Sequence, residues 1–123
     1  MTKTIMIVDD EPDIILSFKI VLLEYGYKVD SFTDPILALE NFKAGLYDLI
    51  IIDIRMPKMC GFELYKELKK IDDKIKVCFL TAGEMYYEEF RSEKVSPALD
   101  DVQCFIRKPI ENEELIRQVK KII

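Results

Sequence analysis

The sequence predicts an α/β fold in which a five-stranded parallel sheet of order 2-1-3-4-5 is doubly wound by helices. Short apolar runs alternate with stretches whose apolar residues recur every three to four positions, which is typical of successive βα units. Three of the runs are continuously apolar, which indicates strands covered on both faces. The chain has 123 residues, the size of one domain, and we expect that domain to span residues 1–123.

Five short segments are predicted to form the strands. They are Thr4–Val8, Lys28–Phe32, Leu49–Ile52, Lys76–Leu80 and Val102–Arg107. The first, third and fourth are the most apolar, so we expect them at the centre of the sheet. The second is the most polar and suits a sheet edge. Right-handed crossovers between successive strands then place helices on both faces.

Helices are predicted between the strands. In the first, the apolar residues at helical spacing are Ile14, Phe18, Val21 or Leu22, and Tyr25. Gly26 is expected to cap the C-terminus of this helix. In the second, Asp34 is an N-cap residue, Pro35 takes the first helical position, and Gly45 is expected to end the helix.

Three further segments have helical patterns: Gly61–Lys70, Glu84–Lys94 and Asn112–Ile122. Pro97 must end the second of them, because proline cannot continue a helix. The third begins with acidic and ends with basic residues, a charge order that suits the helix dipole.

Composition and charge exclude several classes of protein. The net charge is −5, from 18 basic and 23 acidic residues, so we expect no direct nucleic acid binding by this domain. The chain has no histidine, which excludes Ser–His and Cys–His catalytic pairs and histidine metal sites. No apolar stretch approaches the roughly 20 residues that span a bilayer, and the N-terminus runs directly into a predicted strand. We therefore expect a soluble protein without membrane contact.

The cysteines give an expectation about compartment. Cys60, Cys78 and Cys104 are odd in number and widely spaced, which fits neither a disulfide framework nor a zinc site. Cys78 and Cys104 lie in apolar runs, where we expect them to pack in the core as thiols. These features favour a reducing, cytoplasmic setting.

Polar side chains follow four of the predicted strands. They are Asp9, Asp10 and Glu11 after the first strand, Asp53 after the third, Thr81 after the fourth and Lys108 after the fifth. Ligands of open α/β sheets bind beyond the carboxyl ends of the strands. We therefore expect these side chains to meet at one edge of the sheet.

Such a cluster predicts phosphoryl chemistry. Neighbouring carboxylates stay ionised only with a counter-charge, and a hard cation such as Mg²⁺ supplies it. Lys108 offers a second positive charge and Thr81 a hydrogen-bond donor. Asp53, on the central strand, suits a nucleophile that forms an acyl phosphate. Asp10 taken alone has a simpler interpretation, because it can cap the first helix.

Four motifs carry a family resemblance. They are Ile7-Val8-Asp9-Asp10-Glu11-Pro12, Leu49-Ile50-Ile51-Ile52-Asp53-Ile54-Arg55-Met56-Pro57, Phe79-Leu80-Thr81-Ala82 and Phe105-Ile106-Arg107-Lys108-Pro109. With them the chain resembles, over essentially its whole length, the receiver domain of two-component response regulators. That family has a flavodoxin-like (βα)5 fold.

The resemblance implies a role for each site residue. Asp53 would be the phosphoryl acceptor, and Lys108 would contact the phosphate. Mg²⁺ would be held by Asp9, Asp10, Asp53 and the backbone carbonyl of Arg55. Thr81 and Phe105 would form the switch pair. A cis peptide bond is expected between Lys108 and Pro109.

The resemblance also implies partners. A sensor histidine kinase or phosphotransfer protein would pass a phosphoryl group to Asp53, and the domain would catalyse only its own phosphorylation and dephosphorylation. The surface of the fourth helix, fifth strand and fifth helix would then shift, and it is a possible homodimer face. We expect an exposed tyrosine there.

Two features depart from the family pattern. The segment Ala82–Asp101 is longer than usual, and Ser96–Asp101 replaces the customary Gly-Ala turn before the last strand. Cys60 stands where an acid often sits, so it is either a neutral loop substitution or a redox-sensitive thiol near the site.

Other functions fit less well. A phosphatase of the haloacid dehalogenase type needs an acid two residues after its nucleophile, where this chain has Arg55. The acidic residues after the first strand would repel a flavin phosphate. One alternative stays open, a receiver-like interaction module that is never phosphorylated.

Overall fold

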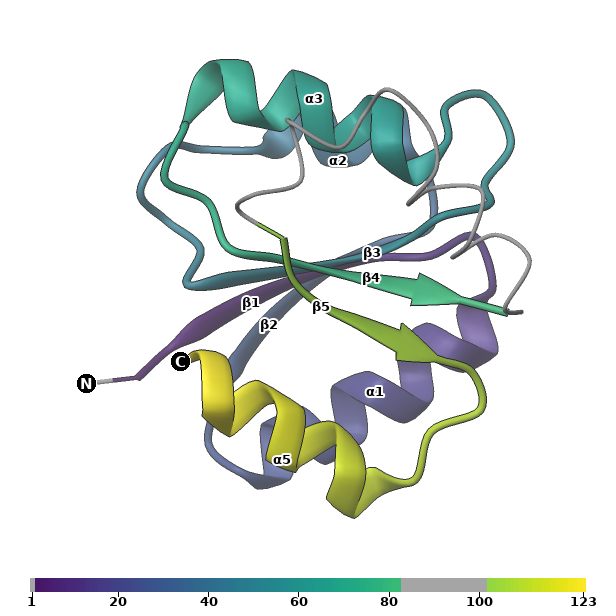
Figure 1. The fold of residues 1–123 in the computed structure, drawn as a ribbon, viewed down its shortest axis with the longest axis vertical. Coiled ribbons are helices and arrows are strands. Elements are labelled where there is room, and N and C mark those ends of the chain that lie inside the picture. The colour runs from purple at the N-terminus through teal and green to yellow at the C-terminus, as the bar shows by residue number, and fades with distance from the viewer. Residues whose placement is uncertain (1, 83–101) are drawn as a thin grey trace.

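The computed structural model describes residues 2–82 and 102–123, which form three layers (Figure 1). The strands are β1 (Thr4–Val8), β2 (Lys28–Phe32), β3 (Leu49–Asp53), β4 (Val77–Thr81) and β5 (Val102–Arg107). The helices are α1 (Pro12–Glu24), α2 (Pro35–Asn41), α3 (Gly61–Ile71) and α5 (Asn112–Ile122). The predicted helix Glu84–Lys94 lies outside the described residues.

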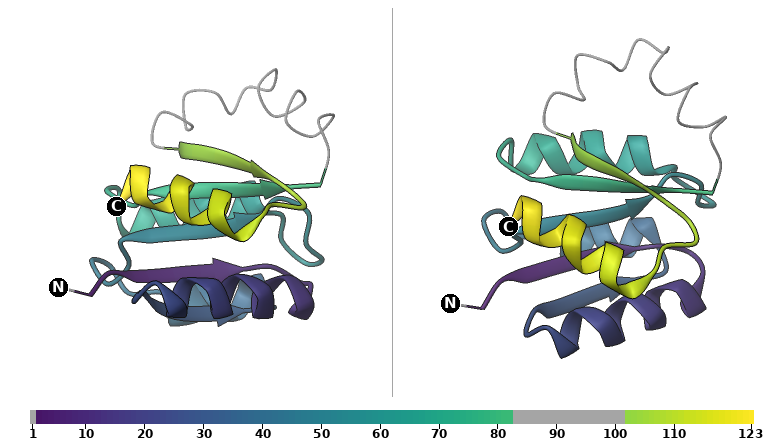
Figure 2. Two further views of the ribbon diagram at one scale, coloured as in Figure 1. Left: turned by 90° about the horizontal axis from the view of Figure 1, so that it is seen from below. Right: turned by 60° about the horizontal axis from the view of Figure 1, so that its bottom comes forward.

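The sheet has the predicted order β2-β1-β3-β4-β5, and all its pairs are parallel. Helices α1 and α5 cover one face, and α2 and α3 cover the other (Figures 1 and 2). The predicted fold class is therefore confirmed. Strands β3 and β4 each end one residue later than predicted, so that Asp53 and Thr81 are the last residues of their strands.

Two hydrophobic cores lie on the two faces of the sheet, because successive side chains of a strand point in opposite directions. In β1, Ile5 and Ile7 pack in the core beneath α1 and α5. Met6 and Val8 pack in the core beneath α2 and α3. Strands β1, β3 and β4 are almost wholly buried, whereas β2 is a half-exposed edge. Each continuous apolar run thus contributes side chains to both cores.

The buried face of α1 is offset by one residue from the predicted one. Ile15, not Ile14, joins Phe18 in the buried stripe, and Ile14 packs at its margin. Tyr25 forms the C-cap of α1 and is 50% exposed, because the helix ends before its side chain can face the sheet. The predicted turn at Gly26 is confirmed by a φ of +88°.

The predicted end of α2 is wrong. The Asp34 carboxylate accepts a hydrogen bond from the Ile36 backbone N–H at 2.8 Å, as the predicted N-cap requires. The helix nevertheless ends at Asn41, well before Gly45. Phe42 adopts an extended conformation and buries its ring in the core, and this packing stops the helix.

The cysteines also differ from the expectation. Cys78 is fully buried in β4, but it is disulfide-bonded and is no thiol. The register of β4 and β5 places it opposite Cys104, whose side chain lies outside the described part. Cys60 is a free cysteine. Cysteine usage therefore gives no support for a reducing compartment.

Among residues 2–82 and 102–123, no helix has the length and apolar character needed to cross a membrane.

Candidate phosphorylation and metal site

The predicted site residues meet at the carboxyl edge of the sheet. Asp10, Asp53, Arg55, Thr81 and Lys108 all line one hollow of about 700 Å³. Asp9, directly after β1, is completely buried beside it. The parallel strands thus bring together groups that lie far apart in the sequence.

Three carboxylates form the acidic part of this site. Asp9, Asp10 and Asp53 each place a carboxylate oxygen within 4.8 Å of the others. The Oδ1 atom of Asp9 accepts a hydrogen bond from the Glu11 backbone N–H at 2.9 Å. Its buried Oδ2 atom receives no further hydrogen bond of good geometry from the described residues and faces the Lys108 ammonium at 2.9 Å. Three converging carboxylates fit the oxygen-rich coordination that a hard divalent cation prefers.

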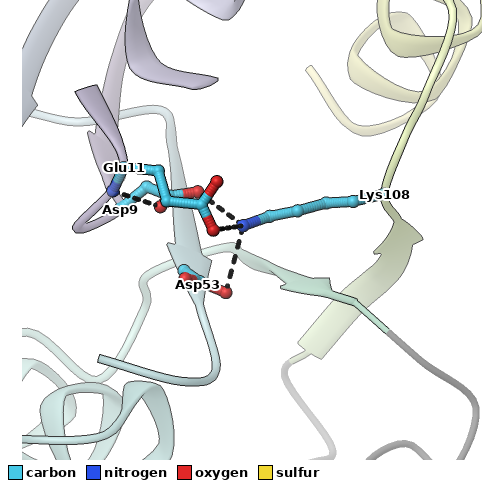
Figure 3. Close-up of polar contacts among 4 residues, drawn as sticks. All are labelled: Asp9, Glu11, Asp53 and Lys108. Carbon is cyan, nitrogen blue, oxygen red and sulfur yellow. Dashed lines mark hydrogen bonds and ion pairs between the residues drawn. The ribbon is translucent and has the colours of Figure 1, made fainter. Parts of the chain in front are cut away.

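Lys108 supplies the positive charge of the cluster. Its extended side chain reaches from the end of β5 toward the carboxylates (Figure 3). The Nζ atom lies 2.9 Å from Asp9 Oδ2, 3.5 Å from Asp53 Oδ1 and 3.9 Å from Glu11 Oε1. Burial lowers the pKa of Lys108, but these carboxylates outweigh it and the pKa is raised. The ammonium therefore stays charged at neutral pH.

Asp53 has the most perturbed acidity of the site. Burial, together with the charge of Asp9, raises the pKa of Asp53 to about 7, although Lys108 acts in the opposite direction. One lysine is therefore too little positive charge for three carboxylates. The site favours an additional cation, because cation binding and ionisation of Asp53 support each other.

Gly61 positions Asp53, a role that the sequence analysis missed. It is the first residue of α3, and a Cβ atom there would overlap the backbone oxygen of Asp53 and lie 3.0 Å from the Cα atom of Ile54. The Gly61 N–H also donates to the Ile54 carbonyl at 2.8 Å. A glycine at the start of a helix was the available signal, because glycine is a poor helix former.

The predicted switch residues occupy different places. Thr81 is buried at the end of β4, and its carbonyl accepts a hydrogen bond from the Lys108 N–H at 2.8 Å. Phe105 is half-buried on β5 and does not line the hollow. Its ring stacks on Phe79, with centroids 5.7 Å apart. The structure thus couples Phe105 to the core of β4.

Two smaller expectations can also be compared with the structure. The Lys108–Pro109 peptide bond is cis, as predicted. Cys60 lines the hollow, and burial raises the pKa of its thiol. A raised pKa disfavours the reactive thiolate, so the neutral loop substitution is the better interpretation of Cys60.

Comparisons with known proteins agree with this geometry. The family model of the response regulator receiver domain matches residues 5–120. The chain is 37% identical to TrrA of Thermotoga maritima, whose structure in complex with Mg²⁺-BeF superposes with a TM-score of 0.83 and covers 99% of this chain and 100% of that one.

Two curated relatives are transcriptional regulators. DltR of Streptococcus agalactiae is 31% identical over 94% of this chain and 50% of its own length. The alkaline phosphatase synthesis regulator PhoP of Bacillus subtilis is 32% identical over 100% of this chain and 49% of its own length. The chain thus spans about half the length of these relatives.

Proposed function

Because this chain belongs to the response regulator receiver domain family, we propose that Asp53 accepts the phosphoryl group by which the domain acts in two-component signalling. One observation carries the assignment. Asp53 lines the hollow, has a carboxylate oxygen within 4.8 Å of those of Asp9 and Asp10, and faces the Lys108 ammonium at 3.5 Å. Asp10 also lines the hollow, but it forms no ion pair with Lys108.

The phosphoryl group would come from a phosphohistidine of a sensor kinase or a phosphotransfer protein. An oxygen of Asp53 bonds to phosphorus as the P–N bond to the histidine breaks, which leaves an acyl phosphate on the domain. Water later attacks the phosphorus, and Asp53 is regenerated as inorganic phosphate leaves. Lys108 would balance the charge of the phosphoryl oxygens. The domain would catalyse only these two reactions on itself, and in this sense it is no enzyme.

Magnesium is the proposed cofactor. Asp9, Asp10 and Asp53, with the backbone carbonyl of Arg55, would hold it, and the convergence of the three carboxylates within 4.8 Å supports this assignment. When bound, Mg²⁺ supplies the positive charge that the cluster lacks. TrrA, a structural relative, was determined with Mg²⁺-BeF.

Thr81 and Phe105 are the proposed switch pair. Thr81 lines the hollow, and its hydroxyl is a donor that a phosphoryl group on Asp53 would attract. The movement of Thr81 would let the Phe105 ring turn inward, since the ring already stacks on Phe79 of the same strand as Thr81. The surface formed by β5, α5 and the expected helix Glu84–Lys94 would then change, and a homodimer through it is proposed.

The setting of the domain is also a proposal. We propose one receiver domain over residues 1–123, located in the cytoplasm, where ATP-dependent sensor kinases act. The net charge of −5 argues against direct contact of this domain with nucleic acid.

Phosphorylation of the isolated chain tests the assignment of Asp53. With phosphoramidate and Mg²⁺, intact mass should show one added phosphoryl group, and Asp53→Asn should abolish it. Asp30→Asn, on the edge strand β2, is the matched control and should be phosphorylated normally. Undiminished labelling of Asp53→Asn would contradict the assignment. A wild-type chain that takes no phosphoryl group would instead favour the docking-only module.

A further inference from the structure

We propose that a second hollow, at the amino ends of the strands, binds an acidic segment of a partner protein. This lysine hollow has a volume of about 430 Å³. Its lining residues are Lys3, Tyr47, Asp48, Lys74, Lys76, Lys120, Lys121, Ile122 and Ile123. The lysine hollow therefore lies where β1, β3 and β4 begin and α5 ends. In the ribbon, the C-terminus lies at the end of the sheet opposite the arrowheads of the strands (Figure 2), whereas Asp53 is the last residue of β3.

The charge of the lysine hollow is the reverse of the charge of the whole chain. Five lysines line it, and all five are exposed. The one carboxylate side chain among the lining residues, that of Asp48, already accepts a hydrogen bond from the Thr4 backbone N–H at 2.8 Å. A chain with a net charge of −5 thus presents a concentrated positive surface at this end.

The fold leaves most of these charges without an acidic partner. Lys76 donates a hydrogen bond to the Ile122 carbonyl at 3.2 Å, and the ammonium of Lys120 lies 5.3 Å from the centre of the Tyr25 ring. Within residues 2–82 and 102–123, no carboxylate lies within ion-pair distance of Lys3, Lys74 or Lys121. A helix C-terminus favours cations in its last turn, but this accounts only for the lysines of α5. The lysines that precede β1 and β4 need another explanation.

The lysine hollow fits a run of separate anionic groups. Lysine is a compact point charge that pairs with one carboxylate or phosphate at a time, whereas arginine binds either group through a bidentate fork. No arginine is among the lining residues. Nucleic acid would also require a longer basic track than one hollow provides. A run of several aspartate or glutamate side chains fits both its size and its charge.

Binding of a defined acidic peptide tests this proposal. The probe is a fluorescein-labelled decaglutamate with blocked ends, and anisotropy is measured at low and at high salt. The wild-type chain should bind it at low salt and release it as salt rises. Lys74→Glu/Lys121→Glu should weaken binding by about tenfold or more, because like charges then face the peptide. The matched control, Lys19→Glu/Lys66→Glu on α1 and α3, makes the same change in net charge and should bind almost as wild type.

Several results would overturn the proposal: no binding by the wild type, equal losses in the two double variants, or tighter binding of a decathymidylate oligonucleotide than of decaglutamate. If Lys74→Glu/Lys121→Glu fails to fold, Lys74→Gln/Lys121→Gln decides, since it removes the charges without reversing them. Asp53→Asn should bind the peptide normally. The proposed peptide binding and the proposed phosphorylation can therefore be tested, and contradicted, independently of each other.

Discussion

The two ends of the parallel sheet hold opposite charges in different surroundings. At the carboxyl end, Asp9 and Asp53 are buried and the Lys108 side chain is only 11% exposed. At the amino end, the lysines of the hollow are all exposed. Burial makes charges interact strongly and shifts their pKa values, whereas exposed charges are screened by salt. The carboxyl end is therefore built for chemistry, and the amino end for reversible attraction.

The difference in burial has a structural cause. Asp53 and Thr81 are themselves the last residues of central strands that are buried over their whole length, so they share the burial of those strands. The lysines at the amino end lie before the strands or in the last turn of α5, where no further element covers them in the described part of the chain. Substitution of Asp53 at the carboxyl end should therefore change stability in a way that depends on pH and resists salt. Substitution of the lysines at the amino end should have a smaller effect on stability that salt removes.

Reduction of the disulfide at Cys78 should have the largest effect. Cys78 is the second residue of β4, near the amino end, and a disulfide typically stabilises a domain by about 2–4 kcal/mol. We expect a reductant to lower the free energy of unfolding in urea by this amount, with phosphorylation of Asp53 retained. Cys60→Ser, which removes the free cysteine, should respond to the reductant as wild type does. Peptide mapping without reduction would identify the partner of Cys78, and an unfolding midpoint unaffected by reductant would contradict the prediction.

Gly61→Ala should give the next largest effect, at the carboxyl end. The added Cβ would meet the backbone of Asp53 and Ile54, which cannot move aside as a flexible side chain can. We expect a loss of about 2–3 kcal/mol in stability, as for overpacked cores, together with slower phosphorylation because Asp53 is displaced.

Gly45→Ala is the matched control for this substitution. Gly45 has a φ of +77° and no atom near the site of a new Cβ, so alanine should cost about 1 kcal/mol in stability. Its phosphorylation rate should be that of the wild type. Equal phosphorylation by Gly61→Ala and Gly45→Ala would remove Gly61 from its positioning role.

Asp53→Asn should stabilise the metal-free protein, by an amount that depends on pH. The pKa of Asp53 is about 7 in the folded state against 3.8 for an ordinary aspartate. Between these values the folded state binds the proton more tightly than the unfolded state, so the stability of the wild type falls as pH rises from about 4 to about 7. Each pKa unit corresponds to about 1.4 kcal/mol. The attraction of Lys108 is already part of this pKa, and solvent in the open hollow screens the charges and reduces the effect on stability.

We therefore expect Asp53→Asn to be more stable than wild type by about 1–2 kcal/mol at about pH 8, and the gain to vanish near pH 4. Urea unfolding in the presence of a chelator at several pH values measures it. A gain that stays constant with pH would show that ionisation of Asp53 is not its cause.

The sequence was sufficient to predict the carboxyl end of the sheet. The continuous apolar runs identify buried parallel strands, and parallel strands bring their last residues to one edge, so Asp9, Asp53, Thr81 and Lys108 had to meet. No contact between distant elements was needed for this conclusion. The pattern also predicted the order of the strands, because the most polar run had to lie at an edge.

Other features depend on contacts that a local pattern does not contain. The role of Gly61 depends on the approach of α3 to the end of β3, and the position opposite Cys78 depends on the register of β4 and β5. The lysine hollow needs the end of α5 to lie beside the starts of three strands. A shift of one residue, as between Ile14 and Ile15, lies within the width of a helical stripe and is settled by packing.

Lys74→Gln/Lys121→Gln should give the smallest effect and the sharpest contrast between the two ends. Both lysines are exposed at the lysine hollow, where like charges repel one another, so their removal should raise stability by less than about 0.5 kcal/mol. At about 1 M salt the Debye length falls to about 3 Å, and the gain should disappear. The gain of Asp53→Asn should persist at the same salt, because that carboxylate is buried. Urea unfolding of both variants at low and high salt makes the comparison. A gain in the lysine variant that persists at high salt would show that repulsion between exposed charges is not its cause.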